Sequence, residues 1–415
     1  MTDAWHGPPI AVVGIGADGW VGLAAAAREA VAAAEVIFGS ERQLALVPSD
    51  LGGERCAWPS PLLPALPGLL AQHAARRICV VASGDPMFYG IGVTLARLFG
   101  PASLRVLPQP SSASLACARL GWALAETPVL SAVGRPVATV LPDLVDGRRL
   151  LVLSADESTP AEVAKLLRDN GFGGSALTVL EQLGGPSERL RTATAASWDL
   201  DAGDPLNIVA VDCVADPAHT RVTRLPGLPD TVFGGDGQLT KAEVRALTLA
   251  ALAPAPGELL WDVGGGSGSI AIEWCRTHPA CRAVTFERLE RRREQITANA
   301  TALGVPQVRV RGEVLAELAA EHEIPVPDAI FVGGGVTQPG LLETCFAHLR
   351  QGGRLVANAV TAESEALLVA MAAARGGELR KFQIYRAEPL GGFTAWRPQL
   401  PVAQWTVVKS DQGSP

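Results

Sequence analysis

The sequence lacks paired cysteines. Its 415 residues include seven cysteines, an odd number, and none stand as Cys-x-x-Cys. The odd number and the dispersed positions favour reduced cysteines over a disulfide framework and argue against a thiolate zinc site. We therefore expect reduced cysteines that pack as small core residues, and no bound metal. They are Cys56, Cys79, Cys117, Cys213, Cys275, Cys281 and Cys345.

An excess of basic residues and long apolar runs are also missing. The formal net charge is −7, which argues against a nucleic-acid partner. The longest alanine-rich run is interrupted by Arg28 and Glu29, and Met1–Pro9 contains no basic stretch followed by an apolar core. We expect neither a membrane span nor a signal peptide, and hence a soluble cytoplasmic protein. With 48% hydrophobic and 19% charged residues, the chain is typical of globular proteins.

The first half alternates apolar strand-like runs with alanine- and leucine-rich helical runs, which predicts an α/β domain. The expected strands are 10–13, 36–38, 78–82, 104–107, 150–153, 177–180 and 207–211. The expected helices include 23–34, 93–98, 113–120 and 160–169.

A proline- and glycine-rich stretch then interrupts the pattern and predicts a linker at 216–235, between domains 1–215 and 236–415. In the second half the expected strands are 259–263, 283–286, 329–332, 355–359, 380–385 and 404–408. The last two are separated only by a loop and should close the sheet with an antiparallel edge strand. Thr240 and Glu243, three residues apart, predict a capping box at a helix start.

The most informative motif follows the strand 259–263. Asp-x-Gly-x-Gly-x-Gly is filled by Asp262, Gly264, Gly266 and Gly268, with Gly265 and Ser267 between them. A strand, a glycine turn and a helix start build a ligand cradle, because glycine permits sharp turns and close approach. The loop contains no Gly-Lys-Ser or Gly-Lys-Thr, so it is not a phosphate-binding P-loop. The spacing favours an S-adenosylmethionine site over a general nucleoside site.

Three further features surround this motif. Glu287 ends the second strand and can accept hydrogen bonds from both ribose hydroxyls, or can simply be the first exposed residue after that strand. Gly333-Gly334-Gly335 ends the fourth strand, as open space for a bulky acceptor or as a plain turn. Lys241 and Arg245 lie four apart on one helix face, as candidates for binding substrate carboxylates or as a solvated face.

The first half carries a different glycine pattern, Gly14-Ile15-Gly16-Ala17-Asp18-Gly19, which matches a dinucleotide fingerprint. The acidic residue that such a site requires is absent, because Glu35 precedes the second strand rather than following it. The run 82–92, Ala-Ser-Gly-Asp-Pro-Met-Phe-Tyr-Gly-Ile-Gly, is far more specific.

These residues resemble two methyltransferase families joined in one chain. The first half resembles the tetrapyrrole methylases in segments 12–16, 83–92, 110–114, 119–121, 181–184 and 207–209. The second half resembles the S-adenosylmethionine-dependent Rossmann-type (class I) methyltransferases, with the segment 238–245 ahead of the glycine strand indicating the subgroup. In this order, the two halves resemble the bifunctional, decarboxylating precorrin methyltransferases of cobalamin biosynthesis.

The resemblance implies methylation of precorrin-6Y at carbon 5 by the first half, and methylation at carbon 15 with loss of the ring C acetate carboxyl by the second. It implies two S-adenosylmethionine sites per chain, a small-molecule tetrapyrrole substrate and a homo-oligomer. The cofactor contacts that it implies in the second half are Thr240, Gly264, Gly265, Gly266, Ser267, Gly268, Glu287 and Val314. Those in the first half are Gly14, Gly16, Ser83, Gly84, Asp85 and Ser112.

The chain departs from the family pattern at three places. Val133 stands where a histidine is expected, Glu313 stands where an aspartate is usual, and the first glycine turn lacks a following proline. The absence of a Ser-His-Asp or Cys-His set agrees with methyl transfer, because holding donor and acceptor in line can supply roughly 7–11 kcal/mol without a nucleophilic side chain. No catalytic residue can be named from the sequence.

Three alternatives stay open on the sequence alone. The second half can be a methyltransferase for another substrate. The segment Gly14–Gly19 can serve a dinucleotide-dependent oxidoreductase. The first half can be a non-catalytic module that only presents substrate to the second.

Overall fold

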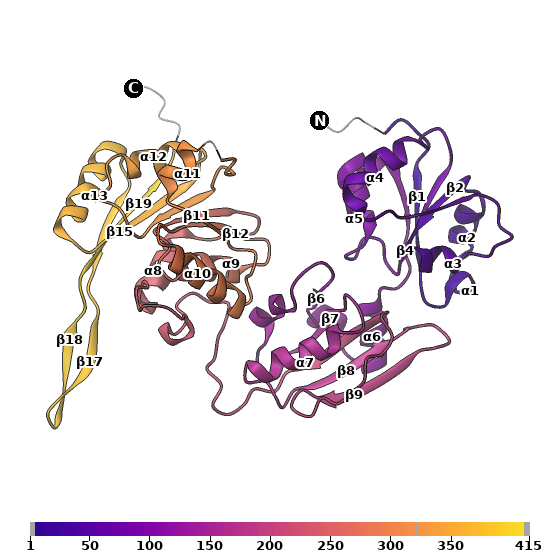
Figure 1. Ribbon diagram of the computed structural model, residues 1–415, viewed down its shortest axis with the longest axis horizontal. Coiled ribbons are helices and arrows are strands. Elements are labelled where there is room, and N and C mark those ends of the chain that lie inside the picture. The colour runs from indigo at the N-terminus through magenta and orange to yellow at the C-terminus, as the bar shows by residue number, and fades with distance from the viewer. Residues whose placement is uncertain (1–4, 321, 411–415) are drawn as a thin grey trace. The chain divides into compact units, whose positions relative to one another are not determined.

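The computed structural model describes residues 5–320 and 322–410, which form two compact units. Unit 1 comprises Met1–Val137 and Val145–His219, and unit 2 comprises Ala138–Leu144 and Thr220–Pro415 (Figure 1). The break at 219–220 falls inside the stretch predicted as a linker. Each unit has its own sheets and core, and the α/β class predicted from the sequence is confirmed.

Unit 1 begins with a five-stranded parallel sheet of order β3-β2-β4-β1-β5. Its central strands are apolar on both faces, as expected of a parallel sheet covered by helices. The strands are β1 (Ile10–Ile15), β2 (Val36–Gly39), β3 (Glu54–Ala57), β4 (Ile78–Ser83) and β5 (Leu104–Leu107). The helices are α1 (Gly19–Gly22), α2 (Ala25–Ala32), α3 (Glu41–Ala45), α4 (Leu62–Ala71) and α5 (Ile91–Phe99).

A second, mixed sheet of order β6-β7-β10-β8-β9 completes unit 1. Strands β6 and β7 are parallel, and the other neighbours are antiparallel. The strands are β6 (Val129–Ser131), β7 (Arg149–Leu153), β8 (Ala176–Glu181), β9 (Arg189–Thr194) and β10 (Asn207–Asp212). Helices α6 (Ser112–Leu120) and α7 (Thr159–Asp169) accompany it, and α6 packs against β10.

Unit 2 is built on a seven-stranded sheet of order β13-β12-β11-β14-β15-β19-β16, in which only β19 runs antiparallel to its neighbours. The strands are β11 (Leu259–Val263), β12 (Arg282–Phe286), β13 (Arg309–Arg311), β14 (Ala329–Val332), β15 (Arg354–Ala359), β16 (Glu378–Phe382) and β19 (Val402–Val408). The helices are α8 (Ala242–Leu252), α9 (Ser269–Thr277), α10 (Glu290–Ala302), α11 (Val314–Ala319), α12 (Leu341–His348) and α13 (Ala362–Arg375).

Two apolar clusters cover the two faces of this sheet. Along β11, Leu260 joins the cluster that includes α8, α9 and α10, while Trp261 joins the cluster that includes α12 and α13. Successive strand residues point to opposite faces, so the two clusters sandwich the sheet. Asp262 therefore lies on the same face as Leu260, beside the start of α9.

Three features of unit 2 differ from the prediction. The antiparallel strand β19 is not the edge strand, because β16 pairs with its outer side. The stretch expected as a loop is a hairpin, β17 (Tyr385–Leu390) and β18 (Phe393–Pro398), which projects from the sheet as a long arm (Figure 1). The capping box is wrong: α8 begins at Ala242 with Lys241 at its N-cap and no side-chain cap, and the Thr240 carbonyl accepts a hydrogen bond from Arg245 instead.

Unit 1 also departs from the prediction. The helix expected at 23–34 corresponds to α2 alone, and the short helix α1 ahead of it was not predicted. The two helices are separate because Leu23 has an extended backbone with ψ 138°. Strands β3, β6 and β9 were not predicted, since they are short or largely exposed and therefore lack an apolar run.

Unit 2 includes a short peptide from the first half of the sequence. Residues 138–144, most of a 3₁₀ helix at Val137–Asp143, pack within unit 2. The Asp143 carboxylate accepts a hydrogen bond from Arg224 Nη2 at 2.6 Å. A Cβ placed on Gly304 would lie 2.5 Å from Pro142 Cδ, so the absence of a side chain there admits the peptide.

None of the described helices is both long enough and apolar enough to span a membrane.

Candidate active sites

A cavity of about 620 Å³ opens at the carboxyl edge of the seven-stranded sheet. The ends of β11, β14 and β15 and the start of the antiparallel β19 meet at this edge, so the loops that follow them share one space. Its lining includes Gly237–Lys241 ahead of α8, Gly264–Gly266 after β11, Gly333 and Gly334 after β14, and Asn358 and Val360 at β15. A volume of this size lies within the usual range of about 300–1,000 Å³ for small-molecule sites.

The glycine loop requires glycine at several positions. Gly264, Gly266 and Gly268 have φ of 79°, 57° and 78°, in the left-handed region that disfavours other residues. A Cβ on Gly264 would also lie 2.7 Å from the backbone nitrogen of Gly334. The two glycine runs are therefore in backbone contact where β11 and β14 end.

The predicted loop contacts divide into two groups. Thr240, Gly264, Gly265 and Gly266 line the cavity. Ser267 lines a smaller hollow beside it, and Gly268 is the N-cap of α9.

Asp262 lies beneath the loop and is 1% exposed. Its carboxylate accepts a hydrogen bond from the backbone N–H of Ala271 at 3.3 Å, in the first turn of α9. Burial, with a smaller contribution from the negative charge of Glu287, raises the pKa of Asp262 to about 7. This carboxyl group is therefore poised to change charge near neutral pH.

Glu287 follows β12 and is 7% exposed. Its two carboxylate oxygens accept hydrogen bonds from the backbone N–H groups of Gly266, at 3.0 Å, and Leu289, at 2.9 Å. Val314 is 2% exposed at the first position of α11. Neither residue belongs to the cavity lining, so their ribose and adenine contacts remain predictions.

The two candidate cations ahead of and within α8 have different surroundings. Lys241 lines the cavity, with 44% of its side chain exposed and its ammonium 3.7 Å from Asp230. Arg245 does not fit a substrate-binding role. Its side chain is fully buried and pairs with Glu273 at 2.5 Å.

Arg245 instead holds the segment that leads into the cavity. It donates hydrogen bonds to the carbonyls of Leu228 and Thr240, and its guanidinium lies 4.7 Å from the Phe233 ring centroid. Glu273 accepts the backbone N–H groups of Gly227 and Leu228. The stretch predicted as a linker is thus partly anchored to unit 2. Despite these partners, burial raises the pKa of Glu273.

The far wall of the cavity was not predicted from the sequence. This wall comprises Asn358, Val360, Phe382, Ile384, Arg386, Gln399, Leu400 and Val402. Half of them, Arg386, Gln399, Leu400 and Val402, come from the stretch 386–403 that was expected as a loop. Among the polar residues of this wall, Asn358 alone gives a signal in the sequence, because it interrupts the apolar run 355–359 near its carboxyl end.

A second, narrower cleft of about 120 Å³ lies in unit 1, between its two sheets. One side comprises loops after β1, β4 and β5, including Gly16, Ser83, Gly84, Asp85 and Ser112. The other side comprises apolar residues and Asn207 of the mixed sheet. Five of the six predicted contacts in the first half therefore meet in this cleft.

The sixth residue, Gly14, brings two of these loops together. A Cβ on Gly14 would lie 1.9 Å from the carbonyl oxygen of Gly84. Gly84 itself has φ 58°.

The polar residues of these loops are held by hydrogen bonds. Ser83 Oγ accepts hydrogen bonds from Arg42 at 2.5 Å and Gln43 at 3.0 Å, while Asp85 accepts the N–H of Met87 at 2.8 Å. Ser111 caps α6 through the N–H of Ser114.

The dinucleotide interpretation of this cleft gains no support from its geometry. Glu35 precedes β2, and its carboxylate accepts the backbone N–H of Arg77 at the amino end of the sheet. The acidic ribose contact of a dinucleotide site belongs at the opposite end.

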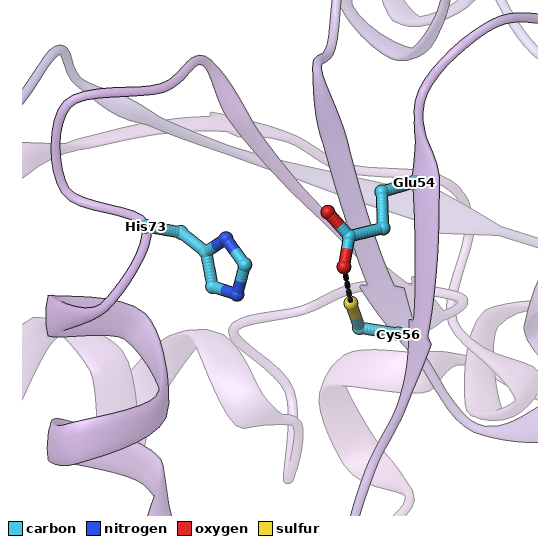
Figure 2. Close-up of side chains that lie close together, drawn as sticks. All are labelled: Glu54, Cys56 and His73. Atoms are coloured by element: carbon cyan, nitrogen blue, oxygen red, sulfur yellow. Dashed lines mark hydrogen bonds between the residues drawn. The ribbon is translucent and has the colours of Figure 1, made fainter.

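One group of metal-ligand types occurs among the described residues, at Glu54, Cys56 and His73 (Figure 2). Cys56 Sγ lies 3.7 Å from Glu54 Oε1. Arg76 Nη1 lies 2.6 Å from Glu54 Oε2 and 3.1 Å from His73 Nδ1, so a guanidinium already neutralises this group. The group lies outside both clefts, and the absence of a metal cofactor remains a prediction.

Two family profiles match the chain, one in each half. Residues 9–199 match the tetrapyrrole (corrin/porphyrin) methylases, and residues 231–409 match the precorrin methyltransferase domain. Together they cover the cavity of unit 2 and all of the unit 1 cleft except Leu206, Asn207 and Ile208.

Curated relatives match the whole chain or part of it. The precorrin-6Y C(5,15)-methyltransferase [decarboxylating] of Mycobacterium tuberculosis is 53% identical, over 96% of this chain and 100% of its own. The cobalt-precorrin-7 C(5)-methyltransferase of Salmonella typhimurium is 33% identical, over 46% of this chain and 96% of its own. The probable cobalt-precorrin-6B C(15)-methyltransferase (decarboxylating) of Pyrobaculum aerophilum is 32% identical, over 43% of this chain and 93% of its own. The chain therefore belongs to the family of decarboxylating precorrin-6Y C(5,15)-methyltransferases.

Proposed function

We propose that this chain methylates precorrin-6Y at carbons 5 and 15 and removes carbon dioxide from its ring C acetate, using S-adenosylmethionine bound at two separate sites. The cleft of unit 1 serves carbon 5. The cavity of unit 2 serves carbon 15 and the decarboxylation. The observation that carries this proposal is the presence of one glycine-lined cleft in each unit, both at the carboxyl ends of parallel strands.

The cavity of unit 2 fits a nucleoside-type methyl donor together with an acceptor. Close backbone approach at Gly264 and the left-handed turn at Gly266 leave room at β11 that side chains would fill. Gly333 and Gly334 keep the neighbouring loop equally open. The far wall extends the space beyond the donor loop, as a bulky macrocycle requires.

Bound S-adenosylmethionine supplies an electrophilic methyl group on its sulfonium. The protein's part is to orient the acceptor carbon in line with that methyl group and to exclude competing water. The carboxylates of the tetrapyrrole need cationic or hydrogen-bonding partners. Lys241, Arg292 and Arg386 line the cavity and supply the positive charge.

The division of labour between the units is supported by relatives with one activity each. Proteins that match less than half of this chain are named as a C(5)-methyltransferase or as a decarboxylating C(15)-methyltransferase. Their existence indicates that the two activities are separable. No comparable observation favours the oxidoreductase or a methyltransferase for a macromolecule. A homo-oligomeric state and a cytoplasmic location stay predictions.

A matched pair of glycine variants tests the two-site proposal in the intact chain. Gly84 and Gly266 have φ of 58° and 57°, and a Cβ on each would lie 3.2 Å and 3.0 Å from a backbone carbonyl oxygen. Calorimetry with S-adenosylhomocysteine should report two sites in the parent. Gly84→Ala and Gly266→Ala should each weaken one site by about tenfold, given the cost of the left-handed backbone for alanine.

Product analysis by mass spectrometry then assigns the reactions. Gly84→Ala should slow methylation at carbon 5 alone, and Gly266→Ala should slow methylation at carbon 15 together with the loss of carbon dioxide. A single site in the parent, or one variant that slows both methylations equally, would refute the proposal. Thermal unfolding of each variant controls for misfolding.

A further inference from the structure

Asn358 lies on the acceptor side of the unit 2 cavity. It is near the carboxyl end of β15, which is separated from β11 by β14 alone. Neighbouring strands are about 4.8 Å apart, which places Asn358 roughly 10 Å along the sheet from the glycine loop. We therefore place Asn358 beside the methyl acceptor rather than beside the methyl donor at the glycine loop.

The amide of Asn358 is held in one orientation by two buried neighbours. The Thr248 hydroxyl donates its only proton to the carbonyl of Val244 at 2.8 Å, so its oxygen can only accept from other groups. Asn358 Nδ2 must therefore face it, and the two atoms are 2.9 Å apart. Gln404 Nε2 then donates to Asn358 Oδ1 at 3.0 Å. Thr248 and Gln404 are 0% and 1% exposed.

This arrangement leaves one N–H of Asn358 for a ligand. Within residues 5–320 and 322–410, no second acceptor for Nδ2 accompanies Thr248. Because Asn358 lines the cavity, this proton is available there. Apolar side chains line the same sheet edge and cannot accept this proton. They belong to Val360, Phe382 and Val402.

A neutral donor in apolar surroundings suits a carboxylate that is to leave as carbon dioxide. In that step the bond between the carboxyl carbon and the CH₂ carbon breaks, and its electron pair passes into the conjugated macrocycle. Carbon dioxide departs, and a proton from water restores the CH₂ group to CH₃. An arginine or lysine partner would stabilise the starting carboxylate more than the charge-dispersed transition state, which slows the step. An amide orients the carboxylate with less ground-state stabilisation.

We propose that Asn358 donates its free N–H to the acetate carboxylate that the enzyme removes, with Thr248 and Gln404 as positioning residues. The carboxylates that remain on the product bind instead at the cations Lys241, Arg292 and Arg386. This inference rests on the proposed function of the unit 2 cavity.

The test uses the full-length enzyme with precorrin-6Y and S-adenosylmethionine, and scores each product by mass spectrometry. Asn358→Leu keeps the side-chain size and removes the donor. It should lower the rate of carbon dioxide loss by about tenfold, because the carboxylate loses the donor that orients it for cleavage of the carbon–carbon bond. Affinity for S-adenosylhomocysteine and methylation at carbon 5 should be unchanged. Gln351→Glu, an exposed change in the same unit, is the matched control.

The positioning role has its own pair of variants. Thr248→Val removes the acceptor that orients the amide and should raise the share of product that is methylated at carbon 15 but still carries the acetate. Thr248→Ser keeps the hydroxyl and should restore the parent ratio. A merely structural role would lower both reactions together and leave this ratio unchanged.

Two outcomes would overturn the inference while leaving the proposed function intact. One is decarboxylation at the parent rate by a folded Asn358→Leu enzyme. The other is a parallel loss of affinity for S-adenosylhomocysteine, which would place Asn358 at the donor. By contrast, a parent enzyme that neither methylates carbon 15 nor releases carbon dioxide would defeat the proposed function itself.

Discussion

The two clefts of this chain are constructed in different ways. The cleft of unit 1 lies between two sheets and measures about 120 Å³, whereas the cavity of unit 2 lies at the edge of one sheet and measures about 620 Å³. The width of an edge cavity is fixed by the hydrogen-bonded spacing of its strands. The width of a cleft between sheets depends on how those sheets are tilted. The first cleft is therefore expected to widen on binding, and the second is largely formed in advance.

Each unit also contains a buried glutamate paired with arginine, and these ion pairs differ in how far they are exposed to water. Removing the glutamate should have the largest effect on stability. Arg245 and Glu273 in unit 2 have exposed side-chain fractions of 0% and 2%. Glu181 beneath the first cleft is equally buried, but its partners Arg189 and Arg191 are 57% and 18% exposed. Their hydrogen bonds lower the pKa of Glu181 against the opposing effect of burial.

Glu273→Gln should destabilise unit 2 by about 3–5 kcal/mol, because it removes the closer carboxylate of a buried guanidinium and leaves only Asp230 at 3.3 Å. Glu181→Gln should cost unit 1 less, about 1–3 kcal/mol, since water reaches its arginines. Hydrogen exchange followed peptide by peptide measures the two units separately. Equal losses would contradict the difference in burial.

The pH dependence of unit 2 should come next in size. Burial raises the pKa of Asp262 from 3.8 to about 7. Between these values the folded state binds the proton that the unfolded state releases, so stability falls as pH rises, by at most about 1.4 kcal/mol per pH unit, and the slope vanishes above the folded pKa. Asp262→Asn should remove this slope.

The measurement is hydrogen exchange of the β11 and β12 amides across that pH range, for parent and variant. The amides of unit 1 serve as the control. Parallel curves for the two proteins would show that Asp262 does not titrate as described.

A smaller effect is expected at the cations of the larger cavity. Arg386 lies 2.6 Å from Glu243, a pair that is 37% and 45% exposed, so its removal should cost little stability. Arg386→Gln should raise KM for methylation at carbon 15 by about threefold to tenfold, through loss of one charged contact to the substrate. Methylation at carbon 5 in the same reaction mixture is the reference. A change in both reactions would mean that Arg386 does not act at one cleft alone.

The smallest effect should come from helix caps, one in each unit. Ser111 caps α6 and Glu313 caps α11 through backbone N–H groups. Ser111→Ala and Glu313→Ala should each destabilise their own unit by about 1 kcal/mol. Chemical denaturation of each variant checks this value, and a loss above about 3 kcal/mol would point to a role beyond capping.

Sequence patterns predicted the parallel strands well because their apolar runs are buried on both faces. They failed where burial is one-sided or where polar residues are paired over long distances. Strand β9 is mostly exposed, and the hairpin β17–β18 has no buried face, so neither gives an apolar run. The spacing of Lys241 and Arg245 placed both on one helix face, but it does not show that Arg245 is buried against Glu273, which is 28 residues away in the sequence.

The predicted glycine positions gather at the two clefts because a tight turn requires glycine whatever surrounds it. The far wall of the unit 2 cavity could not be predicted from the sequence in the same way. Phe382, Leu400 and Val402 meet only because β19 returns antiparallel between β15 and β16. The position of β19 in the sheet is a matter of topology, and the spacing of residues along the sequence does not reveal it.

The peptide 138–144 has a practical consequence for dissecting this enzyme. A cut near residue 220 separates the two sequence halves but strands seven residues of unit 2 on the wrong fragment. The fragment 220–415 would then expose Gly304 and leave Arg224 without Asp143. Complementation with a synthetic peptide spanning 137–145 should raise the melting temperature of that fragment. A stable fragment of unit 2 must therefore include residues 138–144 as well as the chain from residue 220 onward.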